Sequence, residues 1–292
     1  MKTMVIVNKV AAHGRAATTW DLIRPVISRQ GHEYDWAETE RPGHATELAR
    51  GAVDGGYQRI IALGGDGTIH ETVNGMAGTN VILGVIPAGT GNDFAKSLDL
   101  PRSPLAALAA IDSGRVRRID LARANDRYYV NVGGVGFDAE VAGEANRIPK
   151  YIQGAFAYLV AILRILPRYD PVPLRIELDG QRLEERCLLV AAGNGRYTGG
   201  GLKICPGAAP DDGLLDVIVG GNFGKMETLA VLPRVFSGTH VTHPKVTSYQ
   251  ASRVTINSAI PLLVYADGEI LGQTPVTFEV IPGALLVAGA KG

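Results

Sequence analysis

Residues 59–76 read RIIALGGDGTIHETVNGM, and this stretch decides the fold. A short apolar run, Arg59–Leu63, is followed at once by glycines and then by apolar residues with helical spacing, Thr68–Met76. A buried strand that ends in a glycine loop and continues into a helix is the repeating unit of a parallel α/β sheet. The stretch therefore predicts an α/β domain around it.

The sequence on both sides repeats this alternation through the first 115 residues. The expected strands are Val5–Val7, His32–Ala37, Arg59–Leu63 and Val81–Ile86, and the expected helices are Ala16–Gln30, His44–Asp54 and Thr68–Met76. Ligands of open α/β sheets bind outside the carboxyl ends of the strands. We therefore expect the functional residues of this domain in the loops that follow the strands.

After Arg118 the pattern changes to successive strands separated by Gly, Pro and Asp turns, which is typical of an antiparallel β domain. The expected strands are Tyr128–Val132, Leu174–Leu178, Cys187–Ala192, Leu214–Val219, Val254–Ile256 and Leu262–Tyr265, with helices at Tyr151–Leu166 and Lys225–Phe236. The sequence predicts an α/β domain over residues 1–118 and a mostly antiparallel β-sandwich over 119–283. Residues 284–292 complete the first domain if the closing stretch returns to it.

Composition excludes some classes of protein. Lys plus Arg and Asp plus Glu number 29 each, so no net charge attracts nucleic acid. Two cysteines, Cys187 and Cys205, are too few for a disulfide framework, which favours a cytoplasmic protein. The most apolar segment, Gly154–Leu166, is shorter than the roughly 20 residues that span a bilayer. We expect no transmembrane segment, so any membrane contact would be peripheral.

The loop Gly64–Thr68 reads GGDGT. Its glycines let the backbone approach a ligand, and the amides of the following helix favour phosphate oxygens. Asp66 would repel phosphate unless a cation stood between them, which suggests Mg²⁺. The alternative is a tight turn with Asp66 as a helix cap. Glycine-aspartate loops of this kind also occur in NAD kinases and phosphofructokinases.

A second loop, Pro87–Phe94, follows the next strand and reads PAGTGNDF. Thr90 offers a hydroxyl for a phosphate oxygen, and Asp93 offers a second carboxylate for a metal. Helix capping by Asn92 or Asp93 is the alternative. Because neighbouring strands carry the two loops, we expect them at the same edge of the sheet.

The β region places more carboxylates in turns. Asp211 and Asp212 lie in PGAAPDDGLLDV, and Asp267 and Glu269 lie in YADGEIL. Asp-Gly pairs are typical of hairpin turns, so a structural role is the alternative for each turn.

The ordered motifs GGDGT, PAGTGNDF, GVGFDAEV, PGAAPDDGLLDV and DGE resemble those of the lipid kinases related to bacterial diacylglycerol kinase. Eukaryotic diacylglycerol, ceramide and sphingosine kinases belong to the same group. The resemblance runs from Asn8 to about Gly283 and is greatest to the soluble bacterial branch. It implies an NAD kinase/diacylglycerol kinase-like α/β domain followed by a β-sandwich.

The resemblance also implies roles for individual residues. The nucleotide site would contain Asn8, Lys9, Val10, Ala11, Ala12, Thr39, Gly65, Asp66, Gly67, Thr68, Ile69, His70, Glu71 and Thr90. The magnesium network would contain Asp66, Asp93 and Asp212, with backbone oxygens near Ala209 and Leu214. Glu269 would be the catalytic base. A primary hydroxyl is a poor nucleophile, so a carboxylate that accepts its proton makes chemical sense.

The expected activity is transfer of the γ-phosphoryl group of ATP, with Mg²⁺, to a lipid hydroxyl at the membrane surface. Diacylglycerol giving phosphatidic acid is the favoured reaction. A kinase of a soluble substrate such as NAD, and a weakly catalytic nucleotide-binding or lipid-binding protein, are the alternatives. The sequence leaves open which lipid is the acceptor and whether the protein forms a homodimer.

The first loop departs from the family pattern. The family usually has Asn-Pro followed by Ser-Gly, whereas this chain has Asn8, Lys9, Val10, Ala11 and Ala12. Without the early glycine, the backbone is expected to hold a phosphate less closely, although Lys9 adds a positive charge and Gly14 follows.

Overall fold

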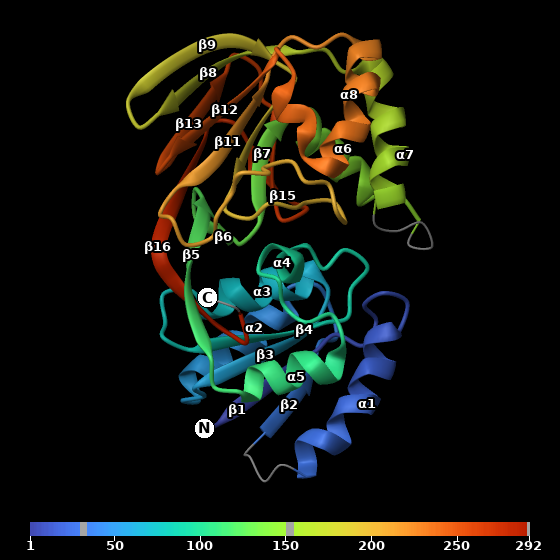
Figure 1. Ribbon diagram of the computed structural model, residues 1–292, viewed down its shortest axis with the longest axis vertical. Helices are drawn as coiled ribbons and strands as arrows, with labels where there is room; N and C mark the ends of the chain where they lie inside the picture. The colour runs from blue at the N-terminus through green and yellow to red at the C-terminus, as the bar shows by residue number, and fades with distance from the viewer. Residues whose placement is uncertain (30–33, 150–154, 291–292) are drawn as a thin grey trace. The chain divides into compact units, whose positions relative to one another are not determined.

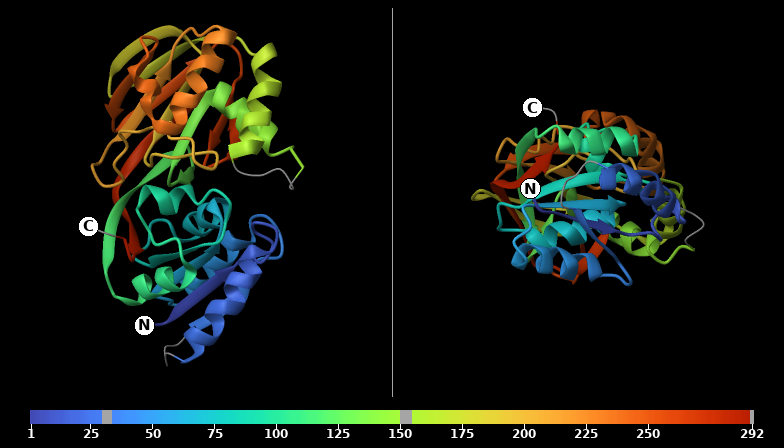
Figure 2. Two further views of the ribbon diagram at one scale, coloured as in Figure 1. Left: turned by 45° about the vertical axis from the view of Figure 1, so that its right-hand side comes forward. Right: turned by 90° about the horizontal axis from the view of Figure 1, so that it is seen from below.

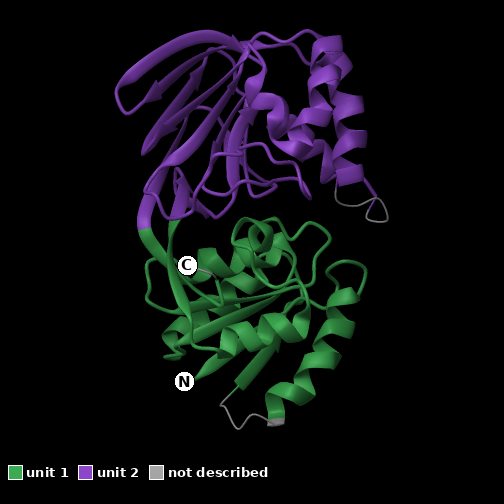
Figure 3. Cartoon of the chain, viewed as in Figure 1, with its two compact units in different colours: residues 1–120, 283–292 green, residues 121–282 purple. Residues whose placement is uncertain are grey.

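The computed structural model describes residues 1–29, 34–149 and 155–290. These residues form two compact units, 1–120 with 283–290, and Leu121–Pro282 (Figure 3). The chain passes from one unit to the other in two strands, β5 (Val116–Ala124) and β16 (Val276–Ala288). The domain boundaries predicted from the sequence lie after residues 118 and 283.

The sheet of unit 1 is parallel (Figure 1). Its strand order is β2 (Tyr34–Glu38), β1 (Thr3–Val7), β3 (Arg59–Gly64), β4 (Ile82–Pro87) and the end of β16. The expected parallel sheet is confirmed, and His32 and Glu33 of its second predicted strand lie outside the described residues. Leu286 of β16 pairs with Ile82 of β4, so the closing stretch of the chain returns to the first unit.

Strand side chains alternate between two helical layers. One face packs against α1 (Arg15–Arg29) and α5 (Pro104–Asp112), and this core contains Val5, Val7, Ile61, Leu63 and Ile86. On the other face α2 (His44–Asp54) packs on β1, and α3 (Asp66–Met76) packs on β3. The predicted helices are present, with Gln30 outside the described residues. The sequence pattern does not predict α5 or the short α4 (Asp93–Ser97), because neither shows an apolar stripe with a polar opposite face.

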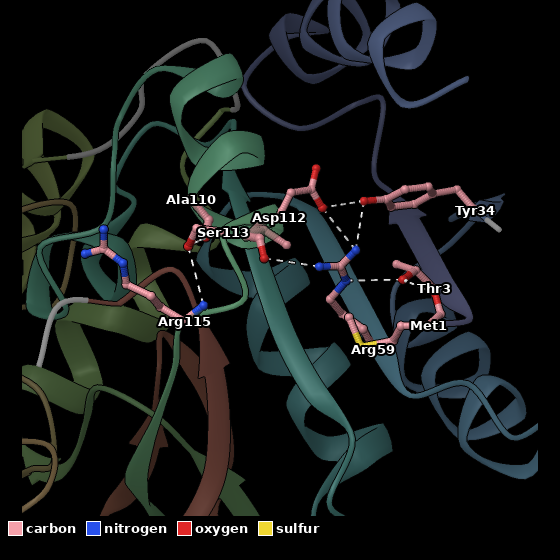
Figure 4. Close-up of polar contacts among 9 residues, drawn as sticks. Met1, Thr3, Tyr34, Arg59, Ala110, Asp112, Ser113 and Arg115 are labelled. Atoms are coloured by element: carbon pink, nitrogen blue, oxygen red, sulfur yellow. Dashed lines mark hydrogen bonds and ion pairs between the residues drawn. The ribbon is translucent and has the colours of Figure 1, made fainter. Parts of the chain in front are cut away.

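A buried arginine ties together the strand beginnings of unit 1 (Figure 4). Thr3, Tyr34 and Arg59 are register partners, and Arg59 is only 4% exposed. Its Nη2 lies 3.1 Å from Asp112 Oδ1 and donates to the Tyr34 hydroxyl at 2.8 Å, while its Nε donates to Thr3 Oγ1 at 3.2 Å. Burial, and then the hydrogen bond to Asp112, raise the pKa of Tyr34 above its usual value, so the phenol stays protonated. These side chains hold one edge of the sheet, while the loops occupy the other.

Unit 2 is a sandwich of two sheets, as predicted. One sheet is antiparallel with the order β12 (Val246–Ala251), β11 (Leu215–Gly220), β10 (Leu189–Gly193), β7 (Val132–Gly136), β14 (Leu263–Ala266) and β15 (Glu269–Gln273). The other contains β16, β13 (Arg253–Ser258), β8 (Val172–Leu178) and β9 (Gln181–Cys187), and β5 pairs with β16 and with β6 (Arg127–Tyr129). Alternate residues of both sheets, such as Val217 and Ile176, meet in one apolar core.

Two of the runs that were predicted to be single strands each contain two strands, and these two belong to different sheets. The run Tyr128–Val132 divides into the end of β6 and the start of β7, and Cys187–Ala192 divides between β9 and β10. At the first break the Asp267 carboxylate accepts hydrogen bonds from the amides of Val130 and Asn131, at 2.8 and 2.9 Å. The apolar run continues across each break because both strands face the same core, so periodicity gives no sign of the change of sheet.

Three helices cover the outer face of the antiparallel sheet whose edge strands are β12 and β15, called the β12–β15 sheet below (Figures 1 and 2). They are α6 (Phe137–Ala145), α7 (Ala155–Ile165) and α8 (Lys225–Ser237), and their apolar residues share one cluster with that face. The sequence predicts α7 and α8 but not α6, and residues 151–154 of the predicted Tyr151–Leu166 helix lie outside the described residues. Short 3₁₀ turns follow α7 at Leu166–Arg168 and α8 at Thr239–Thr242. In the part of the chain that the structure describes, no helix has both the length and the apolar character needed to cross a bilayer.

Replacing Arg59 by Met should lower the free energy of unfolding by roughly 3–5 kcal/mol, because Asp112 would lose its buried partner. Urea denaturation measures the change. Arg175→Met is the matched control, since the Arg175–Glu184 ion pair is exposed and should contribute less than about 1 kcal/mol. Equal losses in the two variants would contradict a structural role for the Arg59 cluster.

Candidate active site

Two glycine-rich loops touch through their backbones at the carboxyl edge of the unit 1 sheet. Gly64 at the end of β3 pairs with Pro87 at the end of β4, and the Ala88 amide donates to Gly64 O at 2.8 Å. A Cβ atom on Gly89 would lie 2.5 Å from the Gly65 Cα, closer than real Cβ atoms approach any atom. The loops can meet in this way because Gly89 has no side chain, and a Cβ atom on Gly65 would make a tight but less severe contact, 3.2 Å from the Gly89 Cα.

Asp66 connects the two loops. It is the first residue of α3, and its Oδ1 accepts a hydrogen bond at 3.1 Å from the amide of Phe94 in α4. The chain reaches α4 through Asn92, whose φ of 53° is left-handed and whose side chain hydrogen-bonds both backbone groups of Gly89. Asp66 thus binds an amide of the neighbouring loop.

The first turn of α3 faces the same loops. The amides of Asp66, Gly67 and Thr68 precede the intrahelical hydrogen-bond ladder, and helix ends of this kind favour anions. Asp93 is 4% exposed and lies 3.2 Å from Lys96 Nζ, whereas Thr90 is exposed.

The first loop is tied to this turn by Asn8. Its Nδ2 donates to Thr68 Oγ1 at 3.0 Å, and its amide donates to Leu63 O at 3.0 Å. The chain then turns through Ala12 and His13, both with left-handed φ, into Gly14. Left-handed non-glycine residues cost about 1–3 kcal/mol each, and such strain clusters at functional sites.

Lys9 and Thr39 occupy the ends of neighbouring strands. Lys9 Nζ forms an ion pair with Glu38 Oε1 at 2.5 Å, so its charge is already matched. Val10 is 80% exposed, and Ala11 packs against the core of unit 1. The Thr39 amide donates to Val7 O at 2.9 Å.

Three predicted nucleotide-site residues, two of them buried and one partly buried, have side chains that contact other parts of unit 1. Ile69 and His70 are buried, and His70 contacts Asn74 one turn later. Glu71 accepts hydrogen bonds from the amides of Gly43 and Ala45, at 2.8 and 3.0 Å. Its carboxylate therefore caps the N-terminus of α2.

In unit 2, Ala209, Asp212 and Leu214 lie in one turn before β11. The Asp212 side chain is exposed, and its Oδ1 accepts a hydrogen bond from the Leu214 amide at 3.0 Å. Asp216 follows on β11 and accepts from the Gly207 amide at 3.1 Å. Burial raises the pKa of Asp216, and the nearby Asp212 charge adds to the shift.

Glu269 begins β15 directly after a tight hairpin turn. The turn residues Asp267 and Gly268 have φ of 49° and 87°, which suits an Asp-Gly hairpin. The Asp267 carboxylate is committed to the amides at the β6–β7 break, whereas the Glu269 side chain is exposed. Of the two acidic residues of this turn, Glu269 is the one in solvent.

The donor set suits magnesium only in part. In the described ranges no group of three or more His, Cys, Asp or Glu side chains is placed to hold a metal ion. Carboxylate and carbonyl oxygens are the ligands that Mg²⁺ accepts, and it commonly binds one or two carboxylates while water and substrate phosphates complete its shell. Asp66 and Asp93 in unit 1, and Asp212 in unit 2, are each a carboxylate of the kind that this mode of binding uses.

A cavity of about 110 Å³ lies between the outer face of the β12–β15 sheet and the three helices of unit 2. Its apolar walls include Ile218 from the sheet, Phe137 and Val141 from α6, Ile162 from α7 and Leu232 from α8. The inward residues of the same strands fill the sandwich core, so alternation along each strand supplies both the core and the cavity.

Family models cover nearly the whole chain. Residues 2–124 match the diacylglycerol kinase catalytic domain, and residues 131–289 match the YegS C-terminal NAD kinase beta sandwich-like domain. The chain belongs to the diacylglycerol kinase family. Membership identifies it as a kinase.

Relatives named diacylglycerol kinase match this chain over most of their length. A protein of Mycobacterium tuberculosis (strain CDC 1551 / Oshkosh) named diacylglycerol kinase is 33% identical, over 98% of this chain and 94% of its own. A protein of Staphylococcus aureus (strain bovine RF122 / ET3-1) with the same name is 35% identical, over 86% of this chain and 81% of its own.

Solved structures show the same fold. A Bacillus anthracis str. Sterne structure covers 98% of this chain and 94% of its own, with a TM-score of 0.84 and 28% identity. A second structure from that organism, described as a diacylglycerol kinase, has a TM-score of 0.76 and 25% identity. It covers 98% of this chain and 96% of its own.

Asp138 is a candidate that the residue-by-residue comparison with the diacylglycerol kinase family did not assign. It lies in GVGFDAEV, at the start of α6, and lines the cavity. Burial raises the pKa of its carboxyl well above the usual range, despite a hydrogen bond from the Ala139 amide. The motif is the only sequence signal for Asp138, since burial beside a cavity has no pattern along the chain.

Replacing Glu71 by Ala should lower the free energy of unfolding by about 2 kcal/mol, because two amides at the start of α2 lose a charged acceptor. Urea denaturation measures this loss. Glu47→Ala, on the exposed face of the same helix, is the control and should cost less than about 1 kcal/mol. Unchanged stability in Glu71→Ala together with lost nucleotide binding would assign Glu71 to the ligand instead.

Proposed function

We propose that this protein transfers the γ-phosphoryl group of ATP, with Mg²⁺, to the hydroxyl of diacylglycerol and so forms phosphatidic acid. Family membership supports the kinase activity. The choice of a lipid acceptor is supported above all by the apolar cavity of unit 2.

The glycine loops of unit 1 are the proposed phosphate site. Gly67 and Thr68 present helix N-terminal amides, which favour negative charge without a side chain that would crowd it. Thr90 adds an exposed hydroxyl from the neighbouring loop. Since the loops hold one another through Gly65 and Gly89, these donors need little reorganisation when phosphate binds.

Asp66, Asp93 and Asp212 are the proposed magnesium residues, with backbone oxygens of Ala209 and Leu214. Bound Mg²⁺ would neutralise charge on the phosphate oxygens. The hydrogen bond from the Phe94 amide orients the Asp66 carboxylate, and the Lys96 ammonium orients that of Asp93. Asp212 is exposed, so its carboxylate should bind Mg²⁺ more weakly than those of Asp66 and Asp93.

Glu269 is the proposed general base. The acceptor hydroxyl must lose a proton as the new P–O bond forms, and an exposed carboxylate can take it. Asp267, the other carboxylate of this turn, already accepts two backbone hydrogen bonds.

The cavity favours a lipid acceptor over a soluble one. Nearly all of the surface that its walls present is apolar, which suits methylene groups and would leave the polar groups of a dinucleotide unpaired. Each buried methylene would contribute about 0.8 kcal/mol to binding.

The same helices offer a surface for a bilayer. Met226, Leu229 and Phe236 form an exposed stripe on α8, and Phe156 and Leu163 are exposed on α7. The opposite sides of both helices line the cavity. We propose that this apolar surface rests in the membrane interface, from which a lipid could reach the cavity.

Wild-type protein should transfer label from γ-labelled ATP to dispersed diacylglycerol and not to NAD. Asp66→Asn, Asp93→Asn and Glu269→Gln should each lower kcat by about a hundredfold or more, the usual loss for a positioned base or charge-stabilising group. Asp212→Ala should cost less, because that carboxylate is exposed.

Glu184→Gln is the control for Glu269→Gln, since both glutamates are exposed on strands of unit 2. Near-normal turnover in all three main variants would contradict the assigned roles. Label on NAD but not on lipid would favour the soluble-substrate alternative.

Met226→Ser with Phe236→Ser should weaken binding to vesicles of phosphatidylglycerol and phosphatidylethanolamine by tenfold or more, because two exposed apolar anchors are lost. Sedimentation with the vesicles measures this. Leu105→Ser, an exposed leucine on α5 of unit 1, is the control. Equal binding by the double variant and wild type would remove α8 from the membrane contact.

A further inference from the structure

The hairpin that carries Glu269 lies at the edge of the β12–β15 sheet. Its second strand, β15, pairs with β14 on one side and ends the strand order of that sheet. The pairing is interrupted by a register shift between Val264 and Tyr265. An edge strand has a single hydrogen-bonded neighbour, so the position of Glu269, the first residue of β15, depends on what holds the turn before it.

Two side chains fix that turn to the rest of unit 2. The Asp267 carboxylate binds the two amides at the β6–β7 break, at 2.8 and 2.9 Å. The carbonyl oxygen of the next residue, Gly268, accepts a hydrogen bond at 2.9 Å from Nδ2 of Asn146, the residue that ends α6. That oxygen belongs to the same planar peptide group as the amide nitrogen and Cα of Glu269. The Asn146 side chain therefore fixes the peptide plane that leads into Glu269.

Asn146 is itself held by a rigid element. Its own amide donates to Ala142 O of α6 at 3.1 Å, and Ile148, two residues later, is buried in the cluster between the helices and the sheet. The helix packs against β14 and β15 (Figure 1). A Cβ atom on Gly143 would be in ordinary contact with Ile270, 3.7 Å from its Cδ1. A side chain supported in this way can hold a neighbouring turn in one place.

We propose that Asn146 is a positioning residue for Glu269, acting through the carbonyl group of Gly268. This inference rests on the proposed function, in which Glu269 is the general base, and deepens it by naming the contact that holds the base in place. Asn146 acts on the turn and touches neither substrate.

The expected effect follows from the geometry that proton transfer needs. A general base must lie within hydrogen-bond reach of the proton that it accepts, and a displacement of about 1 Å can lower the rate by as much as a hundredfold. The Asn146 bond is exposed, and Asp267 still holds the turn when it is lost. We therefore expect a loss of about fivefold to tenfold in kcat, the value of one net hydrogen bond.

A purely structural role is the alternative. In that case the bond from Asn146 stabilises the hairpin as any contact between a helix end and a turn would. Its loss would lower the stability of unit 2 and leave kcat per folded molecule unchanged. The two roles differ in kcat and in whether the effect depends on the Glu269 carboxylate.

The first test measures phosphorylation of dioleoylglycerol from γ-labelled ATP in mixed micelles. Asn146→Ala should lower kcat about fivefold to tenfold and leave KM unchanged for both substrates. Asn146→Gln should keep part of the activity because its amide still donates, whereas Asn146→Asp should lose at least as much as alanine because a carboxylate has no N–H group. Asn257→Ala, at an exposed asparagine of β13 in the other sheet, is the control and should stay within about twofold of wild type.

The second test combines Asn146→Ala with Glu269→Gln. If Asn146 acts only through the carboxylate of Glu269, the double variant should be as slow as Glu269→Gln alone. Hydrogen exchange of the backbone amides of residues 267–273, followed by mass spectrometry without substrates, should be faster in Asn146→Ala than in wild type and unchanged in Asn257→Ala.

An unchanged kcat in Asn146→Ala, or losses that multiply in the double variant, would overturn the role of Asn146 and leave the kinase activity standing. Full turnover in Glu269→Gln would overturn the assignment of the base, and this inference with it. Failure of wild type to phosphorylate the lipid would instead overturn the proposed function. A lower kcat at constant KM that disappears in the Glu269→Gln background supports the inference.

Discussion

The contact between Gly65 and Gly89 is the constraint on which the phosphate-facing part of unit 1 depends. Two loops from neighbouring parallel strands approach so closely that a Cβ atom on Gly89 would lie 2.5 Å from the Gly65 Cα. This approach brings the Phe94 amide to the Asp66 carboxylate, and it leaves the first turn of α3 open towards ligand. Asn8 then fastens the first loop to Thr68 of the same turn. Positioning thus comes from backbone packing and short polar contacts.

The two edges of the parallel sheet have different tasks. At the strand beginnings, Arg59 binds Asp112 and the Tyr34 hydroxyl in the interior, an arrangement that stabilises the sheet and is closed to ligands. At the strand ends, the loops carry glycines, carboxylates and hydroxyls. In unit 2 the division is between the two faces of one sheet, because inward residues such as Val217 build the sandwich core and outward residues such as Ile218 line the cavity.

Much of this could be predicted from local patterns. The GGDGT and PAGTGNDF loops follow buried strands and precede helices, so their place at one sheet edge follows from the alternation alone. The strand pairs that change sheet at Val130–Asn131 and at Leu188 could not be predicted, since the apolar pattern continues through the change. Glu71 shows a different limit, because its role as the cap of α2 depends on a contact 28 residues away in sequence. In the sequence, Asp138 is marked only by its place in the GVGFDAEV motif. Its burial beside a cavity depends on the packing of three helices.

A crystal structure of the protein with Mg²⁺ and a non-hydrolysable ATP analogue would test this arrangement of loops most directly. The terminal phosphates should contact the amides of Gly67 and Thr68 and the hydroxyl of Thr90. Phosphates bound elsewhere, with the glycine loops filled by solvent at saturating analogue, would contradict it.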